Sequence, residues 1–259
     1  MGVRSQQDMA TWMKPGYVQG RDWGWSDNIS QKDLLWLPFT EGNGYPRDIS
    51  GNDLVPTSMS GATWEPGPNG YAMAFSGASG QGLYYTLADT VRAGLGACTG
   101  PYAIFMVINI GSVTGSIGGF GSRIINTQTN GDGYSVFTRA GAEILWTSRN
   151  AAGIDTAFPF GDNDFAVNEW VSCLMIMGTD NSHVGYDSTD STIHGPSAAA
   201  ALRDSDVTTD KLIIGNGLGL YGDFKLSELR IFIPTAAGIS SRNLVHTYRP
   251  YEQLMLGSE

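Results

Sequence analysis

The carboxylate, histidine and hydroxyl groups of this chain do not form the patterns that catalysis requires. Glycoside cleavage needs two carboxylates facing one bond, as acid and as nucleophile or base. Glu65, Glu143 and Glu169 are isolated in the sequence, and we expect each to be a solvated or turn residue. None of the three histidines lies near a nucleophile-elbow motif, and no glycine-rich stretch leads into the Lys-Ser or Lys-Thr of a phosphate loop. The sequence therefore predicts a protein that is not an enzyme.

Aromatic residues near predicted strand ends are the candidates for sugar binding. The face of a pyranose ring stacks on an aromatic side chain, while its hydroxyl groups need fixed hydrogen-bond partners. Trp146, Tyr186 and Tyr221 occupy such places in the sequence. Each also fits an ordinary packing role in the core or at its rim, so both interpretations stay open.

The composition favours a polar, glycine-rich β protein. The chain has 35 glycines in 259 residues, about twice the usual share of roughly 7%, scattered as many turns require. Charged residues make up 15%, against about 25% in typical domains, and the net charge is −10. The basic residues form no stripe, so we expect no binding to nucleic acid. The acidic surface also disfavours anionic lipid.

Targeting signals are missing from the sequence. The first twenty residues lack the apolar segment of a signal peptide, and no run approaches the ~18 apolar residues of a membrane span. We therefore expect no export and no membrane insertion. Cys98 and Cys173 can form a disulfide or remain as two thiols, and the missing export signal favours thiols. The polar, glycine-rich surface is typical of extracellular proteins, whereas the chain shows no export signal. A protein of a virus particle fits both observations, because the particle is built in the cytoplasm and acts outside the cell.

Short strand candidates separated by turn residues recur from Leu34 onward. Two of them, Tyr102–Ile110 and Trp170–Met177, are apolar on both faces and are predicted to be central strands. So many strands need two sheets face to face to bury one side each. The predicted fold is therefore an all-β, antiparallel two-sheet jelly-roll sandwich. The other predicted strands are Leu34–Phe39, Tyr71–Ser76, Leu83–Thr86, Arg123–Gln128, Tyr134–Arg139, Glu143–Trp146, His183–Tyr186, Lys211–Ile214 and Leu226–Ile233.

The last strand candidate shows a regular alternation. Successive side chains of a strand point to opposite faces. The pattern predicts one face with Leu226, Glu228, Arg230 and Phe232, and an opposite face with Ser227, Leu229, Ile231 and Ile233. After this strand, Ser240 or Ser241 can cap one short helix over Arg242–Tyr248.

The two ends of the chain differ from its body. Residues 1–33 hold three tryptophans without a sustained strand or helix period. Because exposed tryptophan is costly, this arm must pack on its own domain or dock on a neighbouring subunit, and both remain open. The predicted division is an anchoring arm at 1–33, a body at 34–248 and a tail at 249–259. The predicted assembly contacts are Trp12, Trp23, Trp25, Tyr251 and Leu254.

Four motifs from Leu34 to Tyr248 resemble, in order and spacing, the laminin-G-like, concanavalin A-like jelly-roll family. The family resemblance implies a sandwich of a kind that mostly binds rather than catalyses. The four motifs are Leu34–Phe39 with the turn Glu41–Gly44, the turn Asp48–Asn52 with the strand Tyr71–Ser76, the strand opening Glu169–Ser172, and Leu212–Gly217 with the closing strand Gly222–Phe232.

The resemblance also implies a metal site. Members of the family often hold calcium, which takes several oxygen ligands, at a sheet rim. Asp48 and Asn52 lie in the matching turn and Asp223 lies near the closing strand. The same turn sequence also forms Asx turns without a metal, and Glu228 stands where many relatives carry an Asp-Asp pair. Calcium and no cofactor therefore both stay open.

The tail sequence resembles the ends of such domains in tailed-phage genomes. The predicted function is a non-enzymatic structural and adhesion protein of a phage particle, a capsid decoration or fibre-like protein that displays a lectin-like jelly roll. We expect a homo-oligomer that binds other virion proteins and touches host-surface glycans weakly. The alternative is a lectin-like module whose main task is glycan recognition.

Overall fold

A computed structural model describes twelve segments of the chain, and all of their secondary structure is β. No helix in these segments offers an apolar span long enough to cross a membrane. The predicted helix at 240–248, most of the arm and the whole tail lie outside the described residues. These residues are 31–78, 80–87, 102–112, 120–127, 133–139, 143–149, 155–160, 167–177, 183–187, 193–197, 211–215 and 223–234.

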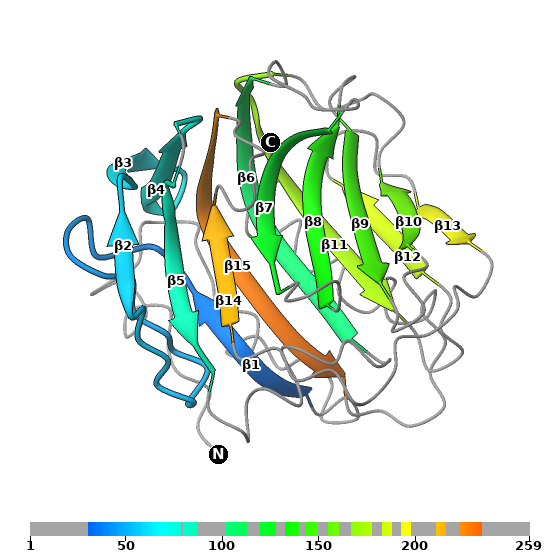
Figure 1. Cartoon of the computed structure of the whole chain (residues 1–259), viewed down its shortest axis with the longest axis horizontal. Coiled ribbons are helices and arrows are strands. Elements are labelled where there is room, and N and C mark those ends of the chain that lie inside the picture. The colour runs from blue at the N-terminus through cyan, green and yellow to red at the C-terminus, as the bar shows by residue number, and fades with distance from the viewer. Residues whose placement is uncertain are drawn as a thin grey trace, which may run out of the picture.

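Two antiparallel sheets pack face to face, as the two layers of Figure 1 show. The predicted all-β sandwich is therefore confirmed. The eight-stranded sheet runs β13 (Ile193–Ser197), β12 (His183–Asp187), β11 (Trp170–Met177), β6 (Tyr102–Ser112), β15 (Asp223–Pro234), β4 (Gly70–Ser76) and β3 (Thr63–Gly67), with β1 (Gln31–Leu37) also paired to β15. The seven-stranded sheet runs β10 (Asp155–Phe160), β9 (Glu143–Arg149), β8 (Gly133–Arg139), β7 (Phe120–Asn126), β14 (Lys211–Gly215), β5 (Gly82–Thr86) and β2 (Ser58–Ser60).

The hydrophobic core fills the space between the two sheets. Its largest side chains are aromatic, and Phe75 stacks on Phe224 with ring centroids 4.7 Å apart. Burial of each large apolar side chain contributes about 1.5–3 kcal/mol. The two strands predicted to be central, β6 and β11, each have a neighbour on both sides, and residues 103–110 and 171–175 are buried. Other core members are Leu35, Leu37, Met73, Leu83, Ile104, Met106, Ile108, Tyr134, Val136, Cys173, Leu212 and Ile214.

A bulge in β15 changes which side chains face the core. The pairing with β6 shifts between Leu226 and Glu228, and both Leu226 and Leu229 belong to the core. The extra residue, Ser227, reverses the phase of the strand. Glu228 and Arg230 therefore lie on the outer face of the sheet, and the prediction that Leu226 shares their face is wrong.

The same bulge marks a change of partner along one side of β15. Before it, Asp223–Leu226 pair with β4; after it, Leu229–Pro234 pair with β1. The Ser227 hydroxyl donates to the carbonyl oxygen of Tyr71 over 3.1 Å and accepts the Asn69 N–H over 3.4 Å. These bonds fix the β3–β4 hairpin next to the end of β1.

Some boundaries differ from the predicted ones. The first strand spans Gln31–Leu37 instead of Leu34–Phe39. The segment from Trp64 to Gly67, which is not among the predicted strands, belongs to strand β3, and a turn follows it at 68–69. The sequence did not predict β2, β3, β10 or β13.

Candidate functional site

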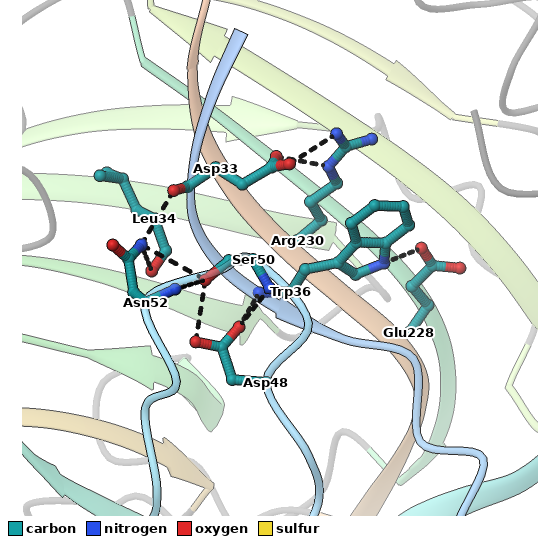
Figure 2. A network of polar contacts seen from close by, with 8 residues as sticks. All are labelled: Asp33, Leu34, Trp36, Asp48, Ser50, Asn52, Glu228 and Arg230. Carbon is teal, nitrogen blue, oxygen red and sulfur yellow. Dashed lines mark hydrogen bonds and ion pairs between the residues drawn. The ribbon is translucent and has the colours of Figure 1, made fainter. Parts of the chain in front are cut away.

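The Asp48 carboxylate organises the turn that follows β1 (Figure 2). It is 4% exposed. Its Oδ1 accepts the N–H groups of Trp36 and Ser50 at 3.0 and 2.9 Å. Its Oδ2 accepts the Ser50 hydroxyl at 2.8 Å and the Leu54 N–H at 3.0 Å. Each carboxylate oxygen thus receives two donors, so this side chain ties the turn at 48–54 to β1.

Asn52 serves the same turn with its amide group (Figure 2). Its Nδ2 donates to the carbonyl oxygens of Asp33 and Leu34 at 2.9 and 3.1 Å, and to the Ser50 hydroxyl at 3.3 Å. The register of β1 shifts between Asp33 and Leu35, so Asn52 donates hydrogen bonds to the carbonyl groups at this irregularity. The amide therefore supports the backbone of β1.

The structure brings two of the three predicted calcium ligands together. Asp48 and Asn52 share Ser50 as a partner. Asp223 is the first residue of β15. It lies seven residues before Arg230, the residue that pairs with Trp36, so Asp223 is separated from the turn by roughly 20 Å at about 3.3 Å per residue. Among the described residues, no three or more His, Cys, Asp or Glu side chains are placed to hold a metal. Calcium and no cofactor therefore both stay open for this turn.

A calcium titration tests the turn directly. Because Asp48 already accepts four donors, we expect Tm to stay within 1 °C of its value when about 1 mM calcium is added to chelator-treated protein. A ligand at about 100 times its Kd adds about 2.7 kcal/mol of stability, so a bound calcium ion would raise Tm by several degrees. Such a rise, lost in Asp48→Asn, would show that the turn takes the ion.

A buried ion pair lies on the outer face of β15 (Figure 2). Arg230 is fully buried and contacts Asp33 through two bonds, Nε to Oδ1 at 2.8 Å and Nη2 to Oδ2 at 3.1 Å. Its guanidinium lies 4.2 Å from the ring centroid of Trp36. The Trp36 indole N–H donates to Oε1 of Glu228 over 2.8 Å. The charges of Asp33, Glu228 and Arg230 therefore serve to hold β1 on β15.

Tyr85 carries its hydroxyl into the core. The side chain is 2% exposed, and the hydroxyl has no hydrogen-bond partner within the described part of the chain. Burial, with smaller contributions from the Asp48 and Glu41 carboxylates, raises the pKa of Tyr85 far above its ordinary value. The phenol therefore stays neutral in the folded protein.

Replacing Tyr85 by phenylalanine is expected to leave stability at pH 7 unchanged or higher, because a buried unpaired hydroxyl costs about 1–3 kcal/mol. Because the pKa of Tyr85 is higher in the folded than in the unfolded protein, the neutral hydroxyl contributes its full stabilisation below about pH 10, the pKa in the unfolded chain. This contribution is lost as the pH rises further. The wild type should therefore lose more stability than Tyr85→Phe between pH 9 and 11, measured by urea denaturation.

In the control Tyr84→Phe, loss of the hydroxyl bond to Gly80 O at 3.2 Å should lower stability at pH 7. Equal pH profiles for wild type and Tyr85→Phe would contradict the assignment.

Three aromatic residues form a cluster at one edge of the sandwich, here named the rim cluster: Tyr45, Trp64 and Tyr71. Trp64 lies on edge strand β3, and its indole N–H donates to the carbonyl oxygen of Gly44 over 2.8 Å. The Trp64 ring meets Tyr71 edge to face at 6.4 Å. Tyr45 directly follows Gly44 in the loop to which Trp64 is bonded. Tyr45 and Tyr71 are 48% and 43% exposed.

Gly42 fixes the loop on the rim cluster. Its φ is +72°, and a Cβ at this position would lie 2.6–2.8 Å from atoms of the Tyr71 ring. Only glycine combines this backbone conformation with such a close approach. The backbone therefore covers part of the Tyr71 ring, and the exposed part of the side chain faces solvent elsewhere.

The rim cluster was not predicted, and the predicted glycan residues are placed only in part. Trp146 lies on β9 of the seven-stranded sheet and Tyr186 on β12 of the eight-stranded sheet, so the two belong to different sheets. Both stay predictions as ligand contacts. The remaining predicted site residues, Trp12, Trp23, Trp25, Tyr221, Tyr251 and Leu254, lie outside the described part of the chain, as does Cys98; Cys173 is buried in the core.

Comparison with known proteins gives structural neighbours but no sequence relatives. The sequence matches no protein-family model and no curated protein. The fold is similar to the receptor-binding domain of botulinum neurotoxin type G, with a TM-score of 0.60 and 12% identity over 85% of this chain and 51% of that one. It is also similar to the binding domain of Paraclostridial mosquitocidal protein 1, with a TM-score of 0.64 and 12% identity over 85% and 52%.

A third neighbour is the binding domain of botulinum neurotoxin DC, solved in complex with rat synaptotagmin II. It gives a TM-score of 0.60 and 11% identity over 85% of this chain and 51% of that one. The chain thus spans about half the length of these neighbours. At such identities the likeness shows a shared β-sandwich fold.

Proposed function

We propose that this chain is a non-catalytic binding module for host-surface molecules, carried on a phage particle. One observation carries the binding role: the rim cluster leaves aromatic side chains about half exposed on an edge of a well-packed sandwich. Large exposed apolar groups on one patch mark surfaces that meet a partner. The structural neighbours named as receptor-binding domains support the same role.

Three carboxylates that are buried or nearly buried also support a role without catalysis. Asp33, Asp48 and Glu228 all accept hydrogen bonds from groups that hold the fold together. A catalytic acid or base must face a reacting group within hydrogen-bond reach. A carboxylate occupied by structural donors does not meet that condition.

Attachment to a particle is proposed through the two ends of the chain, 1–33 and 249–259. Gln31 and Pro234 are partners in the β1–β15 ladder, so the first and the last described residues lie side by side. These two residues lie roughly 20 Å along β1 from Leu37 at about 3.3 Å per residue. The loop that carries the rim cluster follows Leu37. This separation lets one part of the module attach while the other binds.

Co-sedimentation with purified particles tests attachment, and binding of fluorescent protein to host cells tests recognition. Deletion of residues 1–30 should abolish co-sedimentation, since each buried tryptophan contributes about 1.5–3 kcal/mol, while cell binding persists. Binding to cells without any association with particles would favour the alternative, a lectin-like module whose main task is glycan recognition. Release of reducing ends from a polysaccharide would overturn the non-catalytic assignment.

A further inference from the structure

We propose that the rim cluster is the recognition site and that its ligand is a neutral, pyranose-containing glycan. This inference rests on the proposed function as a binding module, and it names the residues and the ligand class. It places recognition at Tyr45, Trp64 and Tyr71.

The exposed rings supply the stacking surface that a sugar needs. Tyr45 is 48% exposed, and within the described residues it makes no ring contact and no side-chain hydrogen bond. Tyr71 is 43% exposed, and its only ring partner in the described part of the chain is Trp64. The apolar C–H face of a pyranose packs on such rings, which combine a flat apolar face with a polar hydroxyl. Both tyrosine hydroxyls are available to sugar hydroxyl groups.

The Trp64 and Tyr71 side chains are held in place before any ligand arrives. Trp64 is bonded to Gly44 O at 2.8 Å and packs edge to face on the buried Phe39, with centroids 6.2 Å apart. Gly42 lies against the Tyr71 ring, and Glu41 Oε1 accepts the Arg47 N–H over 3.3 Å across the loop. Preorganised groups lose little conformational freedom on binding, which raises affinity for a small ligand.

The polar surroundings and the charge select the kind of glycan. Asn43 is exposed between Gly42 and Gly44, and its amide offers both donors and an acceptor to sugar hydroxyls. Arg47 is the one basic residue in the sequence from Thr40 to Leu54, and the whole chain carries a net charge of −10. A sialylated or sulfated glycan would meet repulsion here. A neutral glycan meets none.

The size of the cluster argues against a protein partner. A specific protein interface buries about 800 Å² on each side and about 20–30 residues. Three aromatic side chains on one loop and one hairpin cover far less, a size that suits one or two sugar rings. A protein receptor is therefore an outcome of the test.

The test is a glycan array and titration calorimetry with the full chain and three alanine variants. We expect binding to neutral glycans that is weakened at least tenfold in Tyr45→Ala and in Tyr71→Ala. The matched control is Val55→Ala: Val55 is 66% exposed and precedes β2, the end strand of the seven-stranded sheet. It carries no ring, so binding should not change. Because Tyr71 contacts Trp64, Tyr71→Phe is added; it keeps the ring and should bind within threefold of the wild type.

Each other outcome overturns a defined part of the proposal. Neutral-glycan binding that survives both tyrosine variants would place the site elsewhere and leave the binding function standing. Binding only to acidic glycans, or to a protease-sensitive receptor on cells, would refute the ligand class alone. A wild-type chain that binds neither the array nor host cells would refute the proposed function as well.

Discussion

Replacing Arg230 by alanine is expected to lower the free energy of unfolding by about 3–5 kcal/mol, because it removes one partner of a buried ion pair. The Asp33 carboxylate, whose side chain is 13% exposed, would lose both of its bonds to the guanidinium. The Trp36 ring would lose the cation that lies 4.2 Å from its centroid. Urea denaturation followed by tryptophan fluorescence measures the change.

A second ion pair in the same sheet provides the matched control. Lys225 and Glu65 are 2.6 Å apart, but their side chains are 34% and 41% exposed. Exposed pairs contribute about 0–1 kcal/mol, so Lys225→Ala should cost less than 1 kcal/mol. If the two variants lost similar stability, Arg230 would not act through burial of its charge.

Replacing Asp48 by asparagine is expected to cost about 3 kcal/mol. The amide keeps the shape of the side chain but turns one acceptor oxygen into a donor, so two of the four bonds are lost. Each hydrogen bond to a charged group is worth about 1.5–3 kcal/mol. Urea denaturation gives the loss, and hydrogen exchange should show faster exchange of the amides that Asp48 binds.

The neighbouring carboxylate separates this effect from a simple change of charge. Asp53 lies in the same turn, is exposed and has φ +50°, a conformation that asparagine tolerates equally well. Asp53→Asn should therefore change stability by less than about 0.5 kcal/mol. An equal loss in both variants would mean that the hydrogen bonds of Asp48 contribute little.

The strands inside the two sheets, and β1, were predictable from the sequence, whereas the strands at the ends of the two sheets were not. All eleven predicted strands are present, and the four that were missed, β2, β3, β10 and β13, are the outer strands of the two sheets. Three of them contain a proline: Pro66, Pro159 and Pro196. An edge strand pairs on one side only, so it tolerates a residue without an N–H, and the same residue suggests a turn in the sequence.

The bulge at Ser227 was hidden by a sequence that alternates without interruption. The alternation in Leu226–Ile233 is consistent with a regular strand, and it does not show that one residue is unpaired. The bulge follows from a tertiary requirement, since β15 must pair with β4 before it and with β1 after it. No local pattern carries that information.

The candidate site was missed for a related reason. Trp64 and Tyr71 are seven residues apart on the two strands of one hairpin, and Tyr45 comes from a loop nineteen residues earlier than Trp64. Strand β3 was not predicted, so the Trp64 side chain had no predicted neighbours. The Asp48 turn, by contrast, was recognisable, because Asp-x-Ser-Gly side chains bond to their own local backbone.

The pairing of Gln31 with Pro234 determines how the body responds to mechanical load. Tension that draws these two residues apart breaks the residue pairs between β1 and β15 one after another, starting at Gln31 and Pro234, and needs little force. Tension applied between Leu37 and Pro234 runs along the strands and strains all the rungs together, so the same ladder resists it far more. A load applied at Leu37 against an attachment near Pro234 would therefore act along the strands, the direction in which the β1–β15 ladder resists most.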